Sequence, residues 1–91
     1  MIISDKLIEQ YIKNAGKEFD SHDIIHKLAH DNQKLYIEAL SLTKGKRPFQ
    51  KLHSELGKHI KSICEQLGYT GVDSRSLDIF GQHSKCIRWS I

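Results

Sequence analysis

The sequence has no long apolar run. None of its hydrophobic stretches approaches the roughly 18 residues that a membrane-spanning helix requires. The N-terminus also lacks the features of a signal peptide, because Asp5 stands where a basic region would lie and no extended apolar segment follows. We therefore expect a cytoplasmic protein, and its 91 residues leave room for a single domain over residues 1–91.

Motifs for the common catalytic mechanisms are also absent. The chain has no glycine-rich phosphate loop, no His-Glu-x-x-His run and no Gly-x-Ser-x-Gly elbow. Its two cysteines, Cys64 and Cys86, fall on different expected elements, which favours small core thiols over a disulfide. We expect no enzymatic activity and no cofactor.

The chain contains six histidines, which are potential metal ligands. His22, His26 and His30 recur every four residues on one expected helix, but His22 and His30 are about 12 Å apart along its axis. No cysteine or glutamate nearby completes a ligand set, so solvent-exposed histidines are the favoured interpretation. The sequence predicts no metal site.

Apolar spacing predicts an α+β fold of about four helices followed by a C-terminal β-hairpin. The expected helices cover about residues 4–15, 21–30, 33–42 and 48–66, with a short connector, extended or irregular, at 17–19. The second and third can also form one bent helix, because Asp31-Asn32 is a weaker break than glycine or proline. Helix 48–66 begins at the only proline, which suits the first turn of a helix.

The last quarter of the chain changes to the alternating pattern of β-strands. The apolar positions are Val72, Leu77 and Ile79 in the first strand, and Ile87, Trp89 and Ile91 in the second. Turn-forming residues at 81–84 separate the two. We expect an antiparallel hairpin whose apolar face, anchored by Trp89, covers the helices, because an isolated hairpin is barely stable.

Positive charge is confined to the second half of the chain. Residues 1–43 carry a net charge of −2, whereas residues 44–91 carry +5. The densest basic stretch comprises Lys44, Lys46, Arg47, Lys51, Lys58 and Lys61. Glu55 is the only acid among them, and the stretch coincides with helix 48–66 and the loop before it. A basic helix on a small, otherwise balanced domain is typical of proteins that bind a polyanion, most often nucleic acid.

This order of short helices, basic loop, long basic helix and hairpin resembles a winged helix-turn-helix domain. The resemblance covers residues 19–91 and lies in architecture, not in a signature motif. It implies that helix 48–66 enters the major groove of duplex DNA while the hairpin acts as a wing, and it implies a role in transcription regulation. The loop at 43–48 is longer than the three or four residues of a compact helix-turn-helix.

The resemblance also implies which residues contact DNA. Phosphate contacts fall to Lys44, Lys46 and Arg47 in the loop and to His83 and Lys85 in the hairpin, with Arg88 as a further candidate outside this contact set. Groove-facing positions on the helix are Gln50, Lys51, Ser54, Glu55 and Lys58, and the predicted contact set takes the four of these other than Glu55 together with Lys61. Gln50 suits adenine and Lys51 suits guanine, whereas Glu55 repels phosphates unless it accepts from a cytosine amino group.

The sequence is also compatible with two alternatives to DNA binding. RNA is a second polyanion that the same basic helix can bind. Alternatively, the chain is an interaction or adaptor module, because fold alone does not fix function. In that case the acidic first half faces a basic protein partner, or the basic helix of a second copy in a homodimer. The acids concerned are Glu18, Asp20, Asp23 and Asp31.

Overall fold

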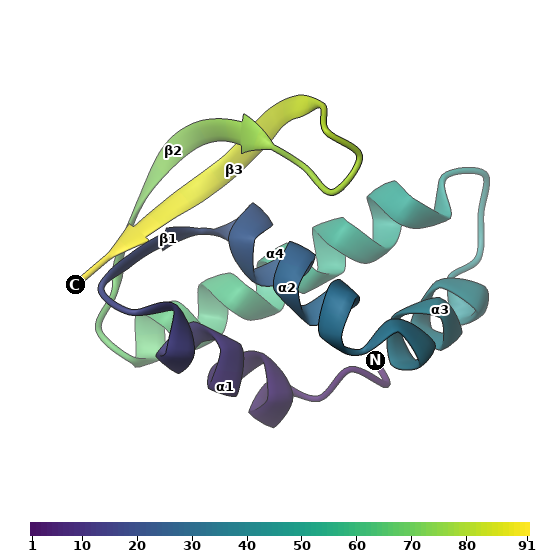
Figure 1. Cartoon of the computed structure of the whole chain (residues 1–91), viewed down its shortest axis with the longest axis horizontal. Helices are drawn as coiled ribbons and strands as arrows, with labels where there is room; N and C mark the ends of the chain where they lie inside the picture. Colours follow the sequence, from purple (N-terminus) through teal and green to yellow (C-terminus); the bar gives the residue numbers. More distant parts are fainter.

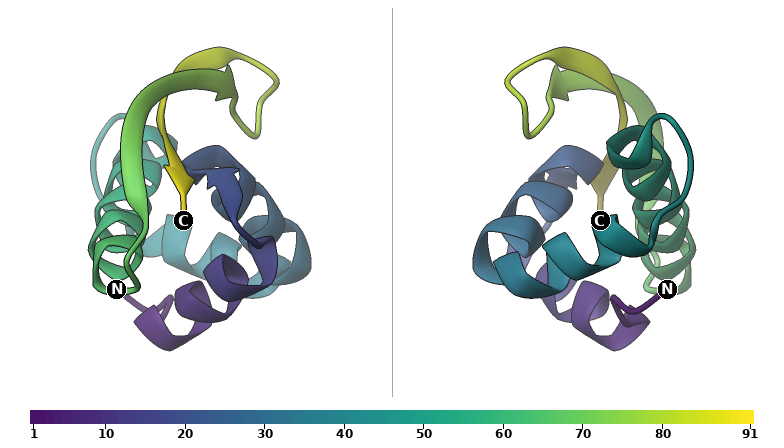
Figure 2. Two further views of the ribbon diagram at one scale, coloured as in Figure 1. Left: turned by 90° about the vertical axis from the view of Figure 1, so that its left-hand side faces the viewer. Right: turned by 90° about the vertical axis from the view of Figure 1, so that its right-hand side faces the viewer.

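Four helices and three strands follow one another along the chain. The computed structural model describes residues 1–91, and its elements are α1 (Asp5–Ala15), β1 (Glu18–Asp20), α2 (Ser21–Asp31), α3 (Gln33–Leu42), α4 (Pro48–Gln66), β2 (Thr70–Leu77) and β3 (His83–Ser90). The predicted α+β class, with four helices and a C-terminal hairpin, is confirmed. Figures 1 and 2 show the hairpin arching over one side of the helices. No helix combines the length and apolar character needed to cross a bilayer.

Capping interactions set the helix boundaries. Ser4 caps α1, since its hydroxyl oxygen accepts the backbone N–H of Leu7. Asp20 and Asp23 form a reciprocal capping box at α2, in which each carboxylate accepts the other's backbone N–H at 2.9 Å. Asn32 separates α2 from α3, so these are two helices. Its side chain does not cap α3 and instead donates to the Leu28 carbonyl.

Trp89 anchors the sheet in the core, as the sequence predicts. Its ring is only 2% exposed, and its Nε1–H donates to Ser21 Oγ at 3.3 Å. The other core residues are mainly aliphatic side chains of the helices: Ile3, Ile8, Ile12, Phe19, Ile24, Ile25, Leu28, Tyr36, Ala39, Leu52, Leu56, Ile60, Ile63 and Cys64. Cys64 is fully buried and free, and burial raises the pKa of its thiol to about 12, so it is a core residue.

The hairpin belongs to a three-stranded antiparallel sheet in the order β1-β3-β2. The connector at 17–19 contributes β1, in which Phe19 pairs with Trp89. The turn covers residues 78–82, earlier than the predicted 81–84, so His83 and Ser84 belong to β3. The hairpin follows the longest helix, as in the winged-helix-like arrangement expected from the sequence.

The predicted apolar face of the hairpin is wrong in three places. Val72 and Leu77 are 57% and 55% exposed, and Ile91 lies beyond β3 and is 64% exposed. Val72 and Leu77 are five positions apart, so the period of two places them on opposite faces of the strand. The residue paired with Trp89 in β2 is instead Gly71, where a Cβ would lie 2.7 Å from the Trp89 ring. The Trp89 ring therefore packs against the backbone of Gly71, and not against an apolar side chain of β2.

Candidate nucleic-acid interface

An open cleft of about 850 Å³ lies between α4 and the hairpin. One wall is a stripe of α4 residues at helical spacing: Gln50, Ser54, Gly57, Lys58 and Lys61. The hairpin contributes Asp78, Phe80, Gln82 and the start of β3, including Lys85. The loop between α3 and α4 adds Lys46 and Arg47 at one end. The start of α2 completes the lining with Ser21, His22 and Ile25, so three parts of the chain that are distant in sequence build one cleft.

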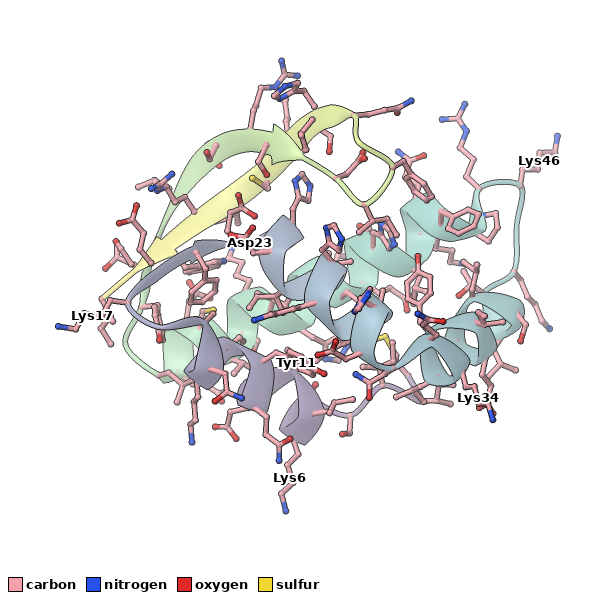
Figure 3. The ribbon with its side chains drawn as sticks, viewed as in Figure 1. Lys6, Tyr11, Lys17, Asp23, Lys34 and Lys46 are labelled. Carbon is pink, nitrogen blue, oxygen red and sulfur yellow. The ribbon has the colours of Figure 1, made fainter.

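A second hollow adjoins this cleft on the outer side of α4. It is lined by Lys44, Gly45, Lys46, Arg47, Gln50, Lys51, Ser54, Glu55 and Lys58, without any apolar residue. Five of these residues line both hollows, so the two form one continuous surface, which we call the basic surface. Figure 3 shows Lys46 projecting outward from the α3–α4 loop at its edge.

The structure brings together nine of the ten residues in the predicted contact set. The exception is His83, which is exposed at the start of β3 and lines neither hollow. The chain's four ion pairs involve Lys13, His30, His59 and Arg88. None of the six lysines and one arginine of the basic surface is therefore neutralised by an acid.

The surroundings of Arg88, the further candidate for a phosphate contact on the hairpin, argue against that role. Its guanidinium pairs with Glu18 across β3 and β1. The Glu18 carboxylate neutralises the positive charge of this guanidinium within the sheet. Lys85, which lines the cleft and takes part in no ion pair, is the hairpin cation on the basic surface.

The N-terminus of α4 adds positive potential to this surface. Pro48 occupies the first turn, Arg47 makes no side-chain capping bond, and the first turn contains no acid. The backbone N–H groups of Phe49 and Gln50 consequently lack intrahelical acceptors. Together with the helix dipole, these amides favour an anion beside Lys46 and Arg47.

Aromatic side chains join the hairpin turn to α4. The Phe80 ring meets Phe49 edge-to-face at 5.1 Å and stacks on His53 at 6.0 Å between centroids. His53 Nε2 in turn lies 2.6 Å from Tyr36 Oη. Burial lowers the pKa of His53, which favours a neutral ring that accepts the Tyr36 hydroxyl proton in this hydrogen bond. Phe49 and Phe80 remain 41% and 53% exposed in the cleft.

Asp78 is the only acid that lines the cleft, and it is engaged by the turn that it shapes. Its Oδ1 accepts the backbone N–H of Gln82 at 3.0 Å and that of Phe80 at 2.9 Å. These bonds, with that of Gln82 the largest contribution, lower the pKa of the Asp78 carboxyl. The Asp78 carboxylate therefore stabilises the turn, and the two N–H groups partly offset its repulsion of an anionic ligand.

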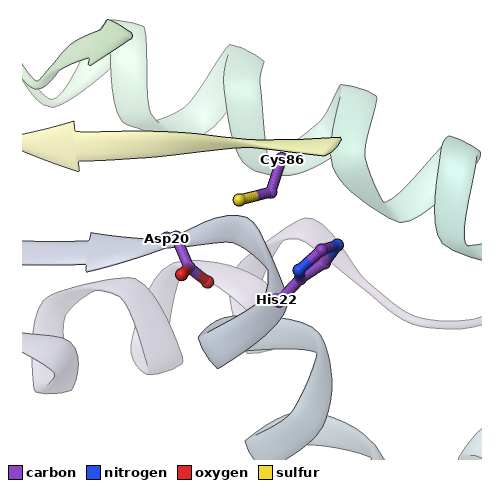
Figure 4. A group of neighbouring side chains, drawn as sticks. All are labelled: Asp20, His22 and Cys86. Atoms are coloured by element: carbon purple, nitrogen blue, oxygen red, sulfur yellow. The ribbon is translucent and has the colours of Figure 1, made fainter. Parts of the chain in front are cut away.

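No sequence pattern predicts a cluster of potential metal ligands that lies beside the cleft. Asp20, His22 and Cys86 bring one potential ligand atom each to within 4.8 Å of one another (Figure 4). His22 is half-buried, which contradicts the interpretation of three solvent-exposed histidines, whereas His26 and His30 are exposed as expected. Only the pairing of β1 with β3 brings Cys86 to the start of α2.

Comparison of the chain with protein-family models, with curated proteins and with solved structures finds no match. The likeness to a winged-helix domain accordingly rests on the order and placement of the elements. Function must then be inferred from the chemistry of the basic surface itself.

Proposed function

We propose that the protein is a non-enzymatic nucleic-acid-binding domain, that duplex DNA is its target, and that the basic surface is the interface. One observation carries this proposal. Seven cationic side chains from a loop, a helix and a strand converge on one surface without any acid partner. Such a concentration of unpaired charge supplies sequence-independent affinity for phosphates and accelerates encounter.

The shape of the surface supports duplex DNA. α4 contains 19 residues, and a helix of that length extends about 28 Å and has the width of the major groove. Gln50, Ser54 and Lys58 form an exposed or cleft-facing stripe in its N-terminal half, from which recognition helices contact base edges. The amides at the start of α4 and Lys85 across the cleft are placed for phosphates on either side.

The acidic half of the chain gives little support to the alternative of a protein-interaction module. Glu18 pairs with Arg88, Asp20 and Asp23 cap α2, and Asp31 accepts from Tyr11. Each of these acids already has a partner within the chain, which weakens the case for a basic protein partner on this side.

A different surface favours a protein partner as the second candidate. Met1, Ile2 and Leu42 are 49%, 40% and 60% exposed and line a common hollow beside α3. This apolar patch is what an adaptor would use; its hollow does not reach the cleft between α4 and the hairpin, but it shares Lys44, Lys51 and Glu55 with the second hollow.

Fluorescence anisotropy with a labelled random-sequence duplex tests the proposal directly. Affinity should fall by about 10³ or more between 50 and 200 mM salt if six or more phosphates are contacted. Parallel titrations with single-stranded DNA and duplex RNA identify the preferred polyanion. Absence of binding to all three at low salt would exclude the proposal and leave the adaptor.

A double substitution then locates the interface. Lys51→Ala with Lys58→Ala should weaken binding and reduce the slope of log K against log salt by about two. The matched control is Lys6→Ala with Lys34→Ala, because both of these exposed lysines point away from the molecule on the side opposite the hairpin (Figure 3). If the two double variants lose equal affinity, α4 is not the recognition element.

A further inference from the structure

Three side chains with different ligand atoms meet where α2 begins beneath β3. Figure 4 shows Cys86 on β3 pointing toward Asp20 and His22, and their ligand atoms lie within 4.8 Å of one another. We propose that these three residues bind a divalent transition-metal ion of the Zn²⁺ type. This site is separate from the lysines of the basic surface and does not depend on the proposed function.

The donor set selects a class of ion. A carboxylate oxygen, an imidazole nitrogen and a thiolate sulfur are the three kinds of ligand that Zn²⁺ takes from proteins, at about 2.0–2.3 Å. Donors of a tetrahedral site are then about 3.5 Å apart, so the side chains need only a small inward adjustment from their present separation. The thiolate disfavours Mg²⁺ and Ca²⁺, which prefer oxygen ligands.

The surroundings orient two of the three ligands. His22 Nδ1 lies 2.8 Å from Ser76 Oγ, and Nε2 lies 3.2 Å from Ser84 Oγ. Whichever nitrogen binds the ion, the other keeps a serine partner, as the ring of a metal-bound histidine usually does. The capping bond uses Asp20 Oδ1, so Oδ2 remains available to the metal without loss of the helix cap.

The position of the cluster predicts what the metal would do. Asp20 and His22 belong to the start of α2, whereas Cys86 belongs to the hairpin. A bound ion would therefore tie the middle of the hairpin, where Cys86 pairs with Ser74, to the helices. His22 and Cys86 also line the cleft, so solvent can supply a fourth ligand from that side. Metal binding to the folded state alone must raise its stability.

Titration of the reduced 91-residue chain with Co²⁺, a spectroscopic substitute for Zn²⁺, tests this site. We expect a thiolate-to-cobalt charge-transfer band that saturates at one equivalent and disappears when Zn²⁺ is added. Cys86→Ser should abolish the band. Asp20→Ser keeps a hydroxyl N-cap for α2 but removes the carboxylate, and it should weaken metal affinity by about tenfold or more.

Two controls separate this site from adventitious binding. Cys64→Ala removes the buried thiol, and His30→Gln removes an exposed histidine of the same helix; both should keep the charge-transfer band. Zn²⁺ should raise the melting temperature of the wild type but not that of Cys86→Ser. A folded wild type without the band, or a band that persists in Cys86→Ser, would overturn the assignment. Neither result decides whether the basic surface binds DNA, because the anisotropy titrations test that proposal separately.

Discussion

Gly57 and Gly71 allow one substitution to be tested in two contrasting environments. Gly57 lies in the middle of α4, where glycine is about 0.8–1.0 kcal/mol less favourable than alanine. A Cβ built at this position meets no atom within 4 Å. The new methyl group thus causes no clash, and we expect Gly57→Ala to raise the free energy of unfolding by about 1 kcal/mol.

The same methyl group at Gly71 has no room. It would lie 2.7 Å from both the Trp89 ring and Ile87 Cγ2. Trp89 is 2% exposed and fixed by its bond to Ser21, so the ring cannot swing into solvent to relieve the contact. Forcing extra volume into a packed site costs about 1–3 kcal/mol. We expect Gly71→Ala to lower the free energy of unfolding by this amount.

Urea denaturation and thermal melting of the two variants measure the difference. A change of 1 kcal/mol shifts the melting temperature of a domain of this size by about 4–8 °C. The two variants should therefore melt about 8 °C or more apart, on opposite sides of the wild type. A destabilised Gly57→Ala would mean that α4 is packed against another surface in solution, and a neutral Gly71→Ala would refute the placement of Trp89 beneath β2.

Gly57 also connects stability with function, because it lies on the wall of the cleft. A glycine that is unfavourable for the helix and fills no packing need within the chain leaves space for close approach of a ligand. Leucine is a good helix former, so Gly57→Leu should retain the fold. Its side chain should nevertheless weaken binding to duplex DNA in the anisotropy assay, and undiminished binding would place the ligand elsewhere on α4.

Two further predictions concern the core and the aromatic cluster. Trp89→Ala should lower the free energy of unfolding by about 3–5 kcal/mol in urea denaturation, as for other buried aromatics, and a near-neutral effect would contradict its anchoring role. Burial lowers the pKa of His53 from its ordinary value of 6.5, so the folded state binds fewer protons than the unfolded state between the two values. The contribution of His53 to stability should therefore be lost as the pH falls from about 6.5 through the folded pKa. His53→Gln, which does not titrate, should flatten this part of the curve, and a wild-type curve no steeper than the variant's would argue against the effect.

Local signals account for the success of the helix predictions. Ser4 and Asp20 cap helices through bonds to residues three positions on, and Pro48 begins α4. The strand predictions were weaker because their determinants are not local. β1 is a three-residue strand that exists only because one edge of β3 accepts it. The exposure of Val72 follows from a register fixed by Trp89 over Gly71, and spacing within the strand cannot reveal that register.

The features of the candidate site also differ in whether local sequence determines them. Most of the basic surface was predictable because its residues lie on one helix and the loop before it, so their relative placement is nearly fixed by the 3.6-residue period. The neutralisation of Arg88 by Glu18 requires the pairing of β1 with β3, which no local pattern shows. The same pairing creates the cluster of Asp20 with Cys86.

The hairpin is held against the helices at both ends, and this bears on how the cleft meets a ligand. At its base, Trp89 is buried in the core and bonded to Ser21. At its turn, Phe80 packs on Phe49 and His53 of α4, in a conformation fixed by Asp78. The distance between Lys85 and the α4 lysines is thus set before a ligand arrives. Binding then loses less conformational entropy than it would with a mobile wing, so more of the electrostatic attraction contributes to affinity.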